Sequence, residues 1–419
     1  MNKIVTAELI SIGDELLYGQ IQDTNSKWIS EQLDKIGVRV VRKTTVGDDR
    51  SALLEAFQSA SEKADIILMT GGLGPTKDDL TKEVLASFFD CSMVLFPKAL
   101  EDLGLLFANR GRELTPTNRQ QAYLPNNCTY IHNAKGTAPG MWFEEKSSIW
   151  MSMPGVPHEM KDLMEKEVIP RIKKRFILPV IYHKMVKTVG IGESWLSDLI
   201  AQWENKLPGH IRLAYLPSLG EVRLRLTGFG EVQNEVMKEV DDQINQLLPL
   251  IERYVYGFNE DTLPSVIGQL LIQNSQTVAL AESCTGGFIS HLITGIGGSS
   301  TYFNGSIVPY HNQFKNHILG VNFLTLEKYG AVSEETVKEM AIQVREKFRA
   351  GYGLASSGIA GPGGGTVEKP VGLVWIGCSD GETCYTRKLQ LTQDRSVNIQ
   401  LTAVAALNLL RETILSTTK

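Results

Sequence analysis

The first part of the chain alternates short apolar runs with amphipathic helical segments, and this alternation limits the possible folds more than any other feature. Residues 7–13 form an apolar run, residues 23–37 carry apolar side chains at helical spacing, and residues 38–46 have a strand pattern. A helical segment at 51–64 and a buried-strand pattern at 65–70 follow. Strand, helix, strand, helix, strand in this order predicts a parallel sheet covered by helices. Ligands of such sheets bind at the carboxyl ends of strands.

The pattern changes near residue 181. Strand-like segments at 184–190, 211–216 and 221–230 accompany two helical segments, which predicts a small α+β module. Between residues 184 and 250 there are seven Lys and Arg and nine Asp and Glu. This acidic balance weighs against nucleic-acid binding by the module, and a spacer or dimerisation element is the simpler interpretation.

A second α/β pattern begins near residue 262. A helical segment at 263–274 precedes a strand at 277–283, and a long amphipathic helix is predicted from residue 395. We therefore predict an α/β protein: a three-layer amino-terminal domain with a mainly parallel sheet, a small α+β middle domain and a carboxy-terminal α/β domain. The predicted boundaries are 1–175, 176–255 and 256–419.

The composition is that of an ordinary globular protein, with 42% hydrophobic residues and a net charge of -5. This charge gives no general affinity for nucleic acid or an anionic membrane surface. The amino terminus lacks a signal-peptide pattern, and no apolar run is long enough to span a membrane. The chain has five cysteines without metal-ligand spacing. We expect a cytoplasmic protein in a reducing compartment.

A glycine-rich loop, TGGLGPTKDDLT at 70–81, follows the predicted strand at 65–70. Its closely spaced glycines expose backbone N–H groups that can bind an anion beside a helix amino terminus. Asp78 and Asp79 could hold a divalent metal, and Asp14 and Glu15 supply two further acids after a neighbouring strand. The alternative is that one of these aspartates only caps a helix and the glycines only make a turn.

Three potential nucleophiles, Ser283, Cys284 and Thr285, stand together in TVALAESCTGG at 277–287. A nucleophile between a strand and a helix gains from nearby backbone N–H groups, which can stabilise an oxyanion. A serine also requires a base, and no histidine has a suggestive spacing. Tyr310 and Lys315 are alternatives, because a lysine kept neutral by burial can deprotonate serine. The sequence alone does not bring Lys315 to Ser283.

Several long motifs carry a resemblance to one family. IGDELLYGQIQDTN, TGGLGPTKDDLT, GTAPGMW and MPGVPHEM resemble the amino-terminal domain of the CinA family, the competence/damage-inducible protein A family, which is similar to molybdopterin-binding domains. The middle segment resembles the family's KH-like domain. AESCTGG, GIAGPGGG and KPVG resemble its carboxy-terminal domain, which also occurs alone as nicotinamide mononucleotide deamidase.

The resemblance implies that the amino-terminal domain hydrolyses ADP-ribose to AMP and ribose 5-phosphate with a divalent metal such as Mg²⁺. Asp79 matches the family's functional aspartate, while Asp78, Asp14 and Glu15 are weaker candidates for the metal. The residues expected to bind substrate in this domain are Gly71, Gly72, Gly74 and Thr76.

The resemblance also implies an amidohydrolase in the carboxy-terminal domain, which needs no metal. Ser283 is then the nucleophile and Lys315, in a Y-x-N-x-x-K pattern, the general base. Tyr310 would position substrate or assist proton transfer, and Glu282 would orient the Ser–Lys pair. Cys284 has no neighbouring cation in the sequence to lower the pKa of its thiol, so it is the weaker nucleophile.

Nicotinamide mononucleotide carries one phosphate, which a glycine-rich loop and a cation can bind. The loop at 356–365 and Arg395 supply both, although Arg395 could be an ordinary surface residue. The residues expected to bind this substrate are Thr285, Gly286, Asn312, Ser357, Gly358, Gly361 and Arg395.

Three alternatives remain open at this point. In the first, the amino-terminal domain serves only to bind a pterin or nucleotide. In the second, the protein is a non-catalytic scaffold in competence or DNA damage, and in the third, one domain has lost its activity. The family implies a homodimer and small-molecule nucleotide partners, and the acidic charge argues against direct DNA binding.

Overall fold

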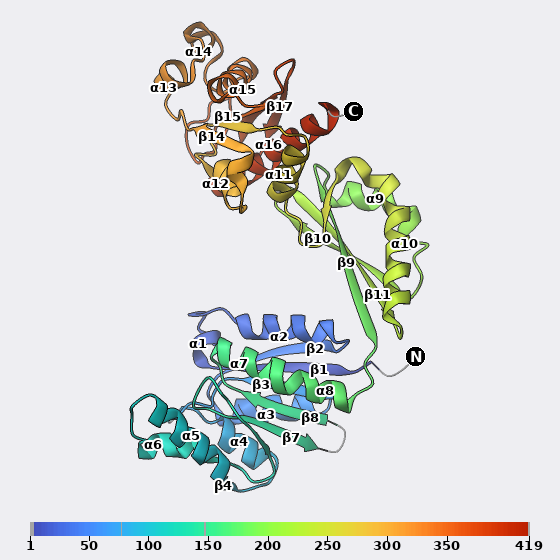
Figure 1. Ribbon diagram of the computed structural model, residues 1–419, viewed down its shortest axis with the longest axis vertical. Coiled ribbons are helices and arrows are strands. Elements are labelled where there is room, and N and C mark those ends of the chain that lie inside the picture. Colours follow the sequence, from blue (N-terminus) through green and yellow to red (C-terminus); the bar gives the residue numbers. More distant parts are fainter. Residues whose placement is uncertain (1–3, 77, 146–147, 418–419) are drawn as a thin grey trace. The chain divides into compact units, whose positions relative to one another are not determined.

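The structure, a computed structural model, describes residues 4–76, 78–145 and 148–417. The chain divides into two compact units, residues 1–182 with 229–237 and residues 183–228 with 238–419 (Figure 1). Among the described residues, no helix is both long enough and apolar enough to cross a membrane.

The first unit is built on a six-stranded sheet with the strand order β2-β1-β3-β8-β7-β6. The first four strands in this order are parallel, and β7 and β6 are antiparallel. Its strands and helices are β1 (Thr6–Ile12), α1 (Asp14–Leu17), α2 (Thr24–Lys35), β2 (Arg39–Val46), α3 (Arg50–Ser61), β3 (Ile66–Thr70), α4 (Thr81–Phe88), β4 (Met93–Leu95), α5 (Pro97–Asn109), α6 (Pro116–Arg119), β5 (Tyr123–Pro125), β6 (Thr129–Ile131), β7 (Gly140–Glu145), β8 (Ser148–Met153), α7 (Pro157–Leu163) and α8 (Ile169–Arg175).

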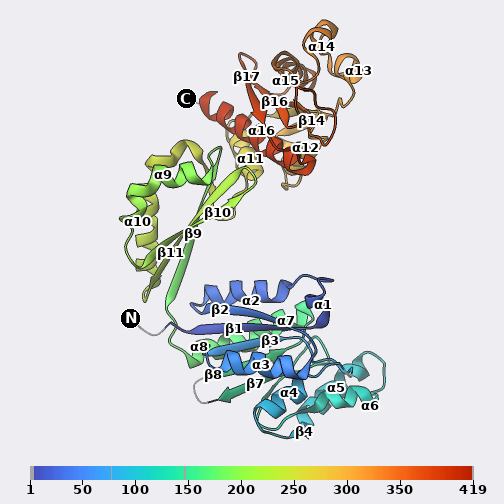
Figure 2. The ribbon, with the colours of Figure 1, turned by 180° about the vertical axis from the view of Figure 1, so that it is seen from behind.

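Strand β3 shows why this unit has three layers. All five of its residues are buried, as expected for a central parallel strand covered on both faces. Ile66 and Leu68 pack with α2, α7 and α8, whereas Ile67 and Met69 pack with α3 and α4 on the opposite face. The two helical layers lie on either side of the sheet (Figures 1 and 2).

The middle segment forms a four-stranded sheet with the order β10-β11-β9-β12. Helices α9 and α10 contribute their buried apolar faces to it, Leu196 and Ile200 from α9 and Val240 and Leu247 from α10. The elements are β9 (Val180–Val189), α9 (Glu193–Glu204), β10 (Ile211–Ser218), β11 (Glu221–Gly230), α10 (Gln233–Ile251) and β12 (Val255–Phe258).

The remaining residues form a five-stranded sheet with the order β14-β13-β15-β16-β17. Strands β14, β13 and β15 are parallel, and β16 and β17 are antiparallel. The elements are α11 (Leu263–Gln273), β13 (Val278–Glu282), α12 (Phe288–Thr294), β14 (Phe303–Ile307), α13 (Asn312–Phe314), a short π-helix (Lys315–Leu319), α14 (Phe323–Tyr329), α15 (Glu334–Phe348), β15 (Tyr352–Gly358), β16 (Leu373–Ser379), β17 (Cys384–Gln390) and α16 (Arg395–Thr417).

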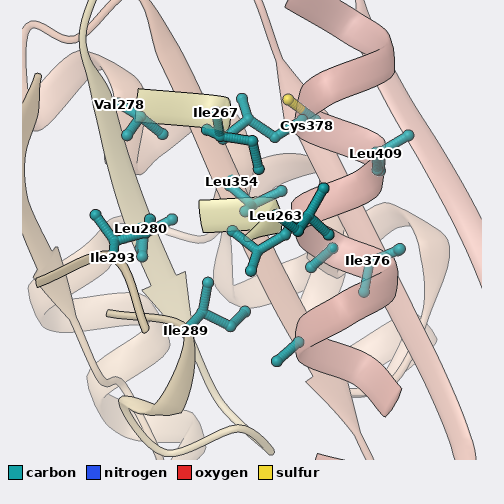
Figure 3. Packing of buried hydrophobic residues seen from close by; sticks show 14 of the residues in the cluster. Leu263, Ile267, Val278, Leu280, Ile289, Ile293, Leu354, Ile376, Cys378 and Leu409 are labelled. Atoms are coloured by element: carbon teal, nitrogen blue, oxygen red, sulfur yellow. The ribbon is translucent and has the colours of Figure 1, made fainter. Parts of the chain in front are cut away.

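Strand β13 lies between β14 and β15 in this sheet and is buried along its whole length. Val278 and Leu280 point into a core shared with α11, α12 and α16, which Figure 3 shows from close by. Ala279 and Ala281 face the opposite core, which α15 covers. Small alanines on that face let α15 lie close to the sheet, so the end of β13 is held from both sides.

The predicted fold class is confirmed: a mainly parallel amino-terminal sheet between helices, an α+β middle segment and a carboxy-terminal α/β segment. The antiparallel strands β6 and β7 at one side of the amino-terminal sheet were not predicted. Strands β7 and β8, and strands β16 and β17, are neighbours in sequence and pair directly with each other, as antiparallel strands can. The domain boundaries stay predictions.

Arg411 on α16 generates a stability prediction. It is only 3% exposed and donates to the carbonyl oxygens of Val255 and Arg253, each at 3.0 Å. Burial lowers the pKa of its guanidinium. We expect Arg411→Ala to lower the free energy of unfolding by about 2–4 kcal/mol, because both carbonyls lose their charged donor. Urea unfolding followed by circular dichroism measures the change.

Arg387→Ala is the matched control. Arg387, on β17, pairs at 2.8 Å with Glu412, which lies on α16 as Arg411 does. Both side chains are 41% exposed, so Arg387→Ala is expected to lower the free energy of unfolding by less than about 1 kcal/mol. Equal effects of the two substitutions would contradict the prediction.

Candidate active site

Ser283 is the first residue beyond the carboxyl end of β13, an inner strand of its sheet. Its N–H donates to the carbonyl oxygen of Ser356 at 3.0 Å, which continues the pairing of β13 with β15 by one residue. The chain then turns through Gly286 and Gly287, whose φ angles of 61° and 98° favour glycine, and enters α12. The two glycines of the motif therefore make the sharp turn that leaves Ser283 at the sheet edge.

Glu282 fixes the geometry of this turn. Its carboxylate is fully buried and accepts from the amides of Gly287 and Ile289 at 3.0 Å, and from the N–H and hydroxyl of Ser290 at 2.8 and 2.6 Å. A carboxylate at a helix amino terminus satisfies N–H groups that have no partner within the helix. Both oxygens of Glu282 thus hold the start of α12, a different task from the predicted orientation of the Ser–Lys pair.

Lys315 reaches Ser283 from the π-helix that follows α13. Its side chain is 1% exposed, and its Nζ lies 3.1 Å from Ser283 Oγ. Nζ also lies 2.8 Å from the carbonyl oxygen of Pro309 and 3.3 Å from that of Tyr310. Burial lowers the Lys315 pKa from 10.5 to about 8, so the neutral amine is accessible near neutral pH.

The three neighbours of Nζ suit an ammonium, which can donate to all three, and equally a neutral amine. A neutral primary amine has two hydrogens and one lone pair, and carbonyl oxygens only accept. If the carbonyls of Pro309 and Tyr310 take the two hydrogens, the lone pair faces the hydroxyl of Ser283. This is the arrangement that a general base requires.

The other two hydroxyl or thiol groups of the motif are less suited to attack. Cys284 is buried, and burial raises the pKa of its thiol to about 12, so it is protonated at neutral pH. The hydroxyl of Thr285 is buried and lies 2.7 Å from that of Ser356. Of the three candidates, only Ser283 has a base at hydrogen-bond distance.

Two backbone groups beside Ser283 remain available. Within the described ranges, the N–H groups of Cys284 and Thr285 donate to no protein acceptor, whereas the next amide, that of Gly286, donates to the Ser283 carbonyl at 3.1 Å. Backbone N–H groups that follow a nucleophile at a strand end can receive an oxyanion.

Arg395 joins two further predicted residues at the start of α16. Its Nη2 donates to the hydroxyl of Tyr310 at 2.8 Å, and its Nη1 donates to the carbonyl oxygen of Gly361 at 2.9 Å. Tyr310 is 56% exposed, so this cluster is accessible to solvent. The Tyr310 hydroxyl therefore contacts Arg395, while the Tyr310 carbonyl accepts from the Lys315 amine.

The amino-terminal glycine loop leaves β3 at the carboxyl edge of its sheet. A Cβ on Gly71 would lie 2.1 Å from the Ile12 carbonyl oxygen, and one on Gly72 would lie 2.1 Å from Thr81 Oγ1. The absence of side chains thus lets the loop pack against β1 and α4. Helix α4 begins at Thr81, and its N-cap, Leu80, makes no side-chain cap bond.

Asp79 closes this loop and does not cap α4. Its carboxylate accepts from the Gly74 amide at 2.8 Å, from the Thr76 amide at 2.9 Å and from the Thr76 hydroxyl. The simple helix-cap alternative for Asp79 is therefore wrong. Asp78 is fully exposed, and a hydrogen bond with the Thr76 side chain lowers its pKa.

The acids near this loop offer only a partial metal site. The backbone N–H of Asp14 donates to Asp48 Oδ2 at 3.2 Å, and that of Asp48 to Asp14 Oδ1 at 3.3 Å. Burial, together with the charges of Asp14, Glu15 and Asp79, raises the Asp48 pKa. Among the residues that the structure describes, no three His, Cys, Asp or Glu side chains gather to hold a metal. Mg²⁺ often takes one or two carboxylates and completes its shell with phosphate oxygens, and these residues fit a metal only in that shared mode.

Comparisons with known proteins identify the family. Residues 8–174 match the probable molybdopterin binding domain, residues 183–257 the damage-inducible protein CinA KH domain, and residues 260–414 the CinA C-terminal domain. A CinA-like protein of Cytophaga hutchinsonii is 49% identical over 411 residues, covering 98% of each chain. The chain belongs to the CinA family.

One further relative matches nearly the whole chain, and one solved structure matches part of it. A putative competence-damage inducible protein of Halothermothrix orenii is 44% identical and covers 96% of each chain. A crystal structure of CinA from Thermoplasma acidophilum, described as of unknown function, is 33% identical over 39% of this chain and 96% of its own, with a TM-score of 0.37.

Several residues expected to bind substrate in the CinA C-terminal domain have other roles here. The hydroxyl of Ser357 is buried and donates to the Ala331 carbonyl at 2.6 Å. A Cβ on Gly358 would lie 2.6 Å from Val374 Cγ2, so close packing on β16 accounts for this glycine. Asn312 is exposed at the first position of α13, and Gly286 is exposed in the turn.

The structure also adds residues that the sequence analysis missed. Ser356 contacts Thr285, Asp48 lies beside Asp14, and the buried side chain of Asn398 holds the loop at 356–365. Asp48 carried a readable signal, because it follows the predicted strand at 38–46 and so reaches the same sheet edge as Asp14. Ser356 lies in the glycine-rich loop at 356–365 that the sequence marked, although its contact with Thr285 was not predicted, and nothing in the sequence marked Asn398.

The depressed Lys315 pKa predicts a pH-dependent stability. Between about pH 8 and 10.5 the unfolded chain keeps the Lys315 proton while the folded chain loses it, so stability rises with pH in this window. Relative to Lys315→Met, the wild type should gain up to about 3 kcal/mol from pH 7 to pH 10.5, since one pKa unit corresponds to ~1.4 kcal/mol.

Urea unfolding of both proteins at several pH values tests this expectation. The measured quantity is the difference in unfolding free energy between the two proteins and how it changes with pH. Other titrating groups contribute about equally to both proteins, and the loss of a partner by two carbonyls in Lys315→Met shifts the difference by about the same amount at every pH. A difference between the two proteins that does not vary with pH would show that Lys315 has an ordinary pKa.

Proposed function

We propose that the carboxy-terminal domain hydrolyses nicotinamide mononucleotide to nicotinate mononucleotide and ammonia. The observation that carries this proposal is the buried Lys315 amine, 3.1 Å from Ser283 Oγ. It lies at a turn where two backbone N–H groups have no acceptor among the described residues. A serine, a neutral lysine and oxyanion donors are the parts needed for acyl transfer from an amide.

In the first step, Lys315 removes the proton of Ser283 while Oγ attacks the carboxamide carbon. The C=O π electrons move to oxygen, and the N–H groups of Cys284 and Thr285 are suited to stabilise the resulting oxyanion. The same Nζ, now an ammonium, is placed to donate its proton to the amide nitrogen. The C–N bond then breaks, and ammonia leaves from an acyl-enzyme.

In the second step, water takes the position of the departed ammonia. Lys315 accepts a proton from this water as its oxygen attacks the ester carbon. The C–Oγ bond breaks and Ser283 regains its proton, which releases the nicotinate product. Each proton moves through Nζ, so a low lysine pKa serves both halves of the reaction.

Arg395 supplies the cation for the substrate phosphate in this proposal. Its guanidinium has five N–H donors, of which the described contacts with Tyr310 and Gly361 use two. Tyr310 would therefore act mainly by positioning Arg395. Thr285, whose hydroxyl is bonded to Ser356, would shape the turn and contribute its backbone N–H.

We predict the following outcome for ammonia release from nicotinamide mononucleotide. Ser283→Ala and Lys315→Met should each lower kcat by about a thousandfold or more, because each removes a part of one catalytic unit. The kcat of Cys284→Ala should stay within about threefold of wild type, because the thiol that this substitution removes is buried and protonated. Circular dichroism confirms that each variant is folded.

An inactive Cys284→Ala with an active Ser283→Ala would reverse the nucleophile assignment and keep the reaction class. Wild-type protein that releases no ammonia would refute the deamidase proposal.

For the amino-terminal domain we propose metal-dependent hydrolysis of ADP-ribose to AMP and ribose 5-phosphate. The glycine loop and the Asp14–Asp48 pair, both at the carboxyl edge of the six-stranded sheet, support this proposal. A divalent metal held by these carboxylates and the substrate would neutralise pyrophosphate charge. Asp79 would act by holding the loop in its observed conformation.

Binding of a pterin without hydrolysis is the alternative for this domain. For the whole protein, a homodimer in the cytoplasm remains our prediction.

Metal removal separates the two proposed activities. EDTA should reduce ADP-ribose hydrolysis by at least about a hundredfold and leave ammonia release unchanged, because only the first reaction is assigned a metal. Readdition of Mg²⁺ should restore the first activity. Hydrolysis of ADP-ribose that persists in EDTA would argue against the metal, and tight pterin binding without hydrolysis would favour the alternative.

A further inference from the structure

Asn398 is a fully buried polar residue in the first turn of α16 that the proposed reaction does not use. Its Nδ2 donates to the carbonyl oxygens of Ala360 at 2.9 Å and Thr392 at 3.0 Å. Its Oδ1 accepts from the N–H and the hydroxyl of Thr392, both at 2.9 Å. An asparagine amide has two donor hydrogens and two acceptor lone pairs, so every bond that this side chain can make is made.

These four bonds join two segments that are distant in sequence. Ala360 belongs to the glycine-rich loop at 356–365, and Thr392 belongs to the segment that leads into α16. Backbone hydrogen bonds link the same two segments through Gly372. Leu391 N–H donates to the Gly372 carbonyl, and Gly372 N–H donates to the Ile359 carbonyl, both at 2.8 Å.

Arg395 and Asn398 hold neighbouring carbonyls of this loop from one helical turn. Asn398 bonds the carbonyl of Ala360, and Arg395 bonds that of Gly361 at 2.9 Å. The backbone of this turn is fixed separately, since Asp394 Oδ1 accepts from the Val397 amide at 3.0 Å. The distance between the loop and the Arg395 guanidinium therefore depends on the Asn398 bonds.

We infer that Asn398 is a positioning residue that sets the loop against Arg395 and thereby the affinity for the substrate phosphate. This inference rests on the proposed deamidase function. Asn398 does not touch the reacting atoms, so its loss should weaken phosphate binding and leave the chemistry at Ser283 intact. A misplacement of about 1 Å is enough to weaken a charge-assisted contact.

The test compares Asn398→Ala with Asn408→Ala in the full-length chain. Asn408 is also a buried asparagine of α16, and it bonds Glu412 at 2.8 Å and Arg411 at 3.0 Å rather than the loop. It therefore controls for general destabilisation of the helix. The substrates are nicotinamide mononucleotide and nicotinamide riboside, which differ only by the phosphate.

We expect Asn398→Ala to raise KM for the mononucleotide about tenfold while kcat stays within about threefold of wild type. Its kcat/KM for the riboside should not change, and Asn408→Ala should alter neither substrate. An equal loss on both substrates, or equal effects of the two variants, would reduce Asn398 to a structural residue and overturn the inference.

Calorimetric binding of nicotinamide mononucleotide distinguishes this failure from failure of the proposed reaction. A wild type that binds the mononucleotide without releasing ammonia, and binds it more weakly after Asn398→Ala, would refute the reaction and support the inference. A wild type that neither binds nor reacts would refute both.

Discussion

The contact between the Lys315 amine and the Ser283 hydroxyl depends on burial, and burial depends on the whole carboxy-terminal domain. An ammonium on the surface would keep its proton at neutral pH and could not accept one from serine. Here burial among the end of β13 and the π-helix lowers the pKa of the amine, and the carbonyl oxygens of Pro309 and Tyr310 fix the position of its nitrogen. Burial of the lysine costs folding free energy, and the same burial lowers its pKa enough for it to act as the proposed base.

The nucleophile needs an equally constrained partner. Two apolar cores hold β13 from opposite faces, and the Glu282 carboxylate anchors the amino terminus of α12 immediately beyond it. The glycine turn between these fixed points has little freedom. Among the residues that the structure describes, the N–H groups of Cys284 and Thr285 beside Ser283 have no protein acceptor, as an oxyanion site requires.

The two α/β sheets use glycine loops in different ways. In the amino-terminal domain, Asp79 holds the loop by bonds to Gly74 and Thr76 within the loop itself. In the carboxy-terminal domain, Asn398 and Arg395 hold the loop from a helix that is distant in sequence. The first loop is a local structure that can be read from its motif, whereas the second exists only once α16 has packed against the sheet.

The sequence by itself determined the order of strands and helices, the motif that contains Ser283 and the family, because apolar periodicity and turn residues act locally. It did not predict the bonds of Glu282 to α12, the bond of Ser357 to Ala331 or the role of Asn398. Only the tertiary structure brought Lys315 to Ser283 and Arg395 to Tyr310, since contacts across 32 and 85 residues depend on how sheets and helices pack. The pKa of Lys315 was likewise decided there, because burial is a property of the packed domain and not of the lysine.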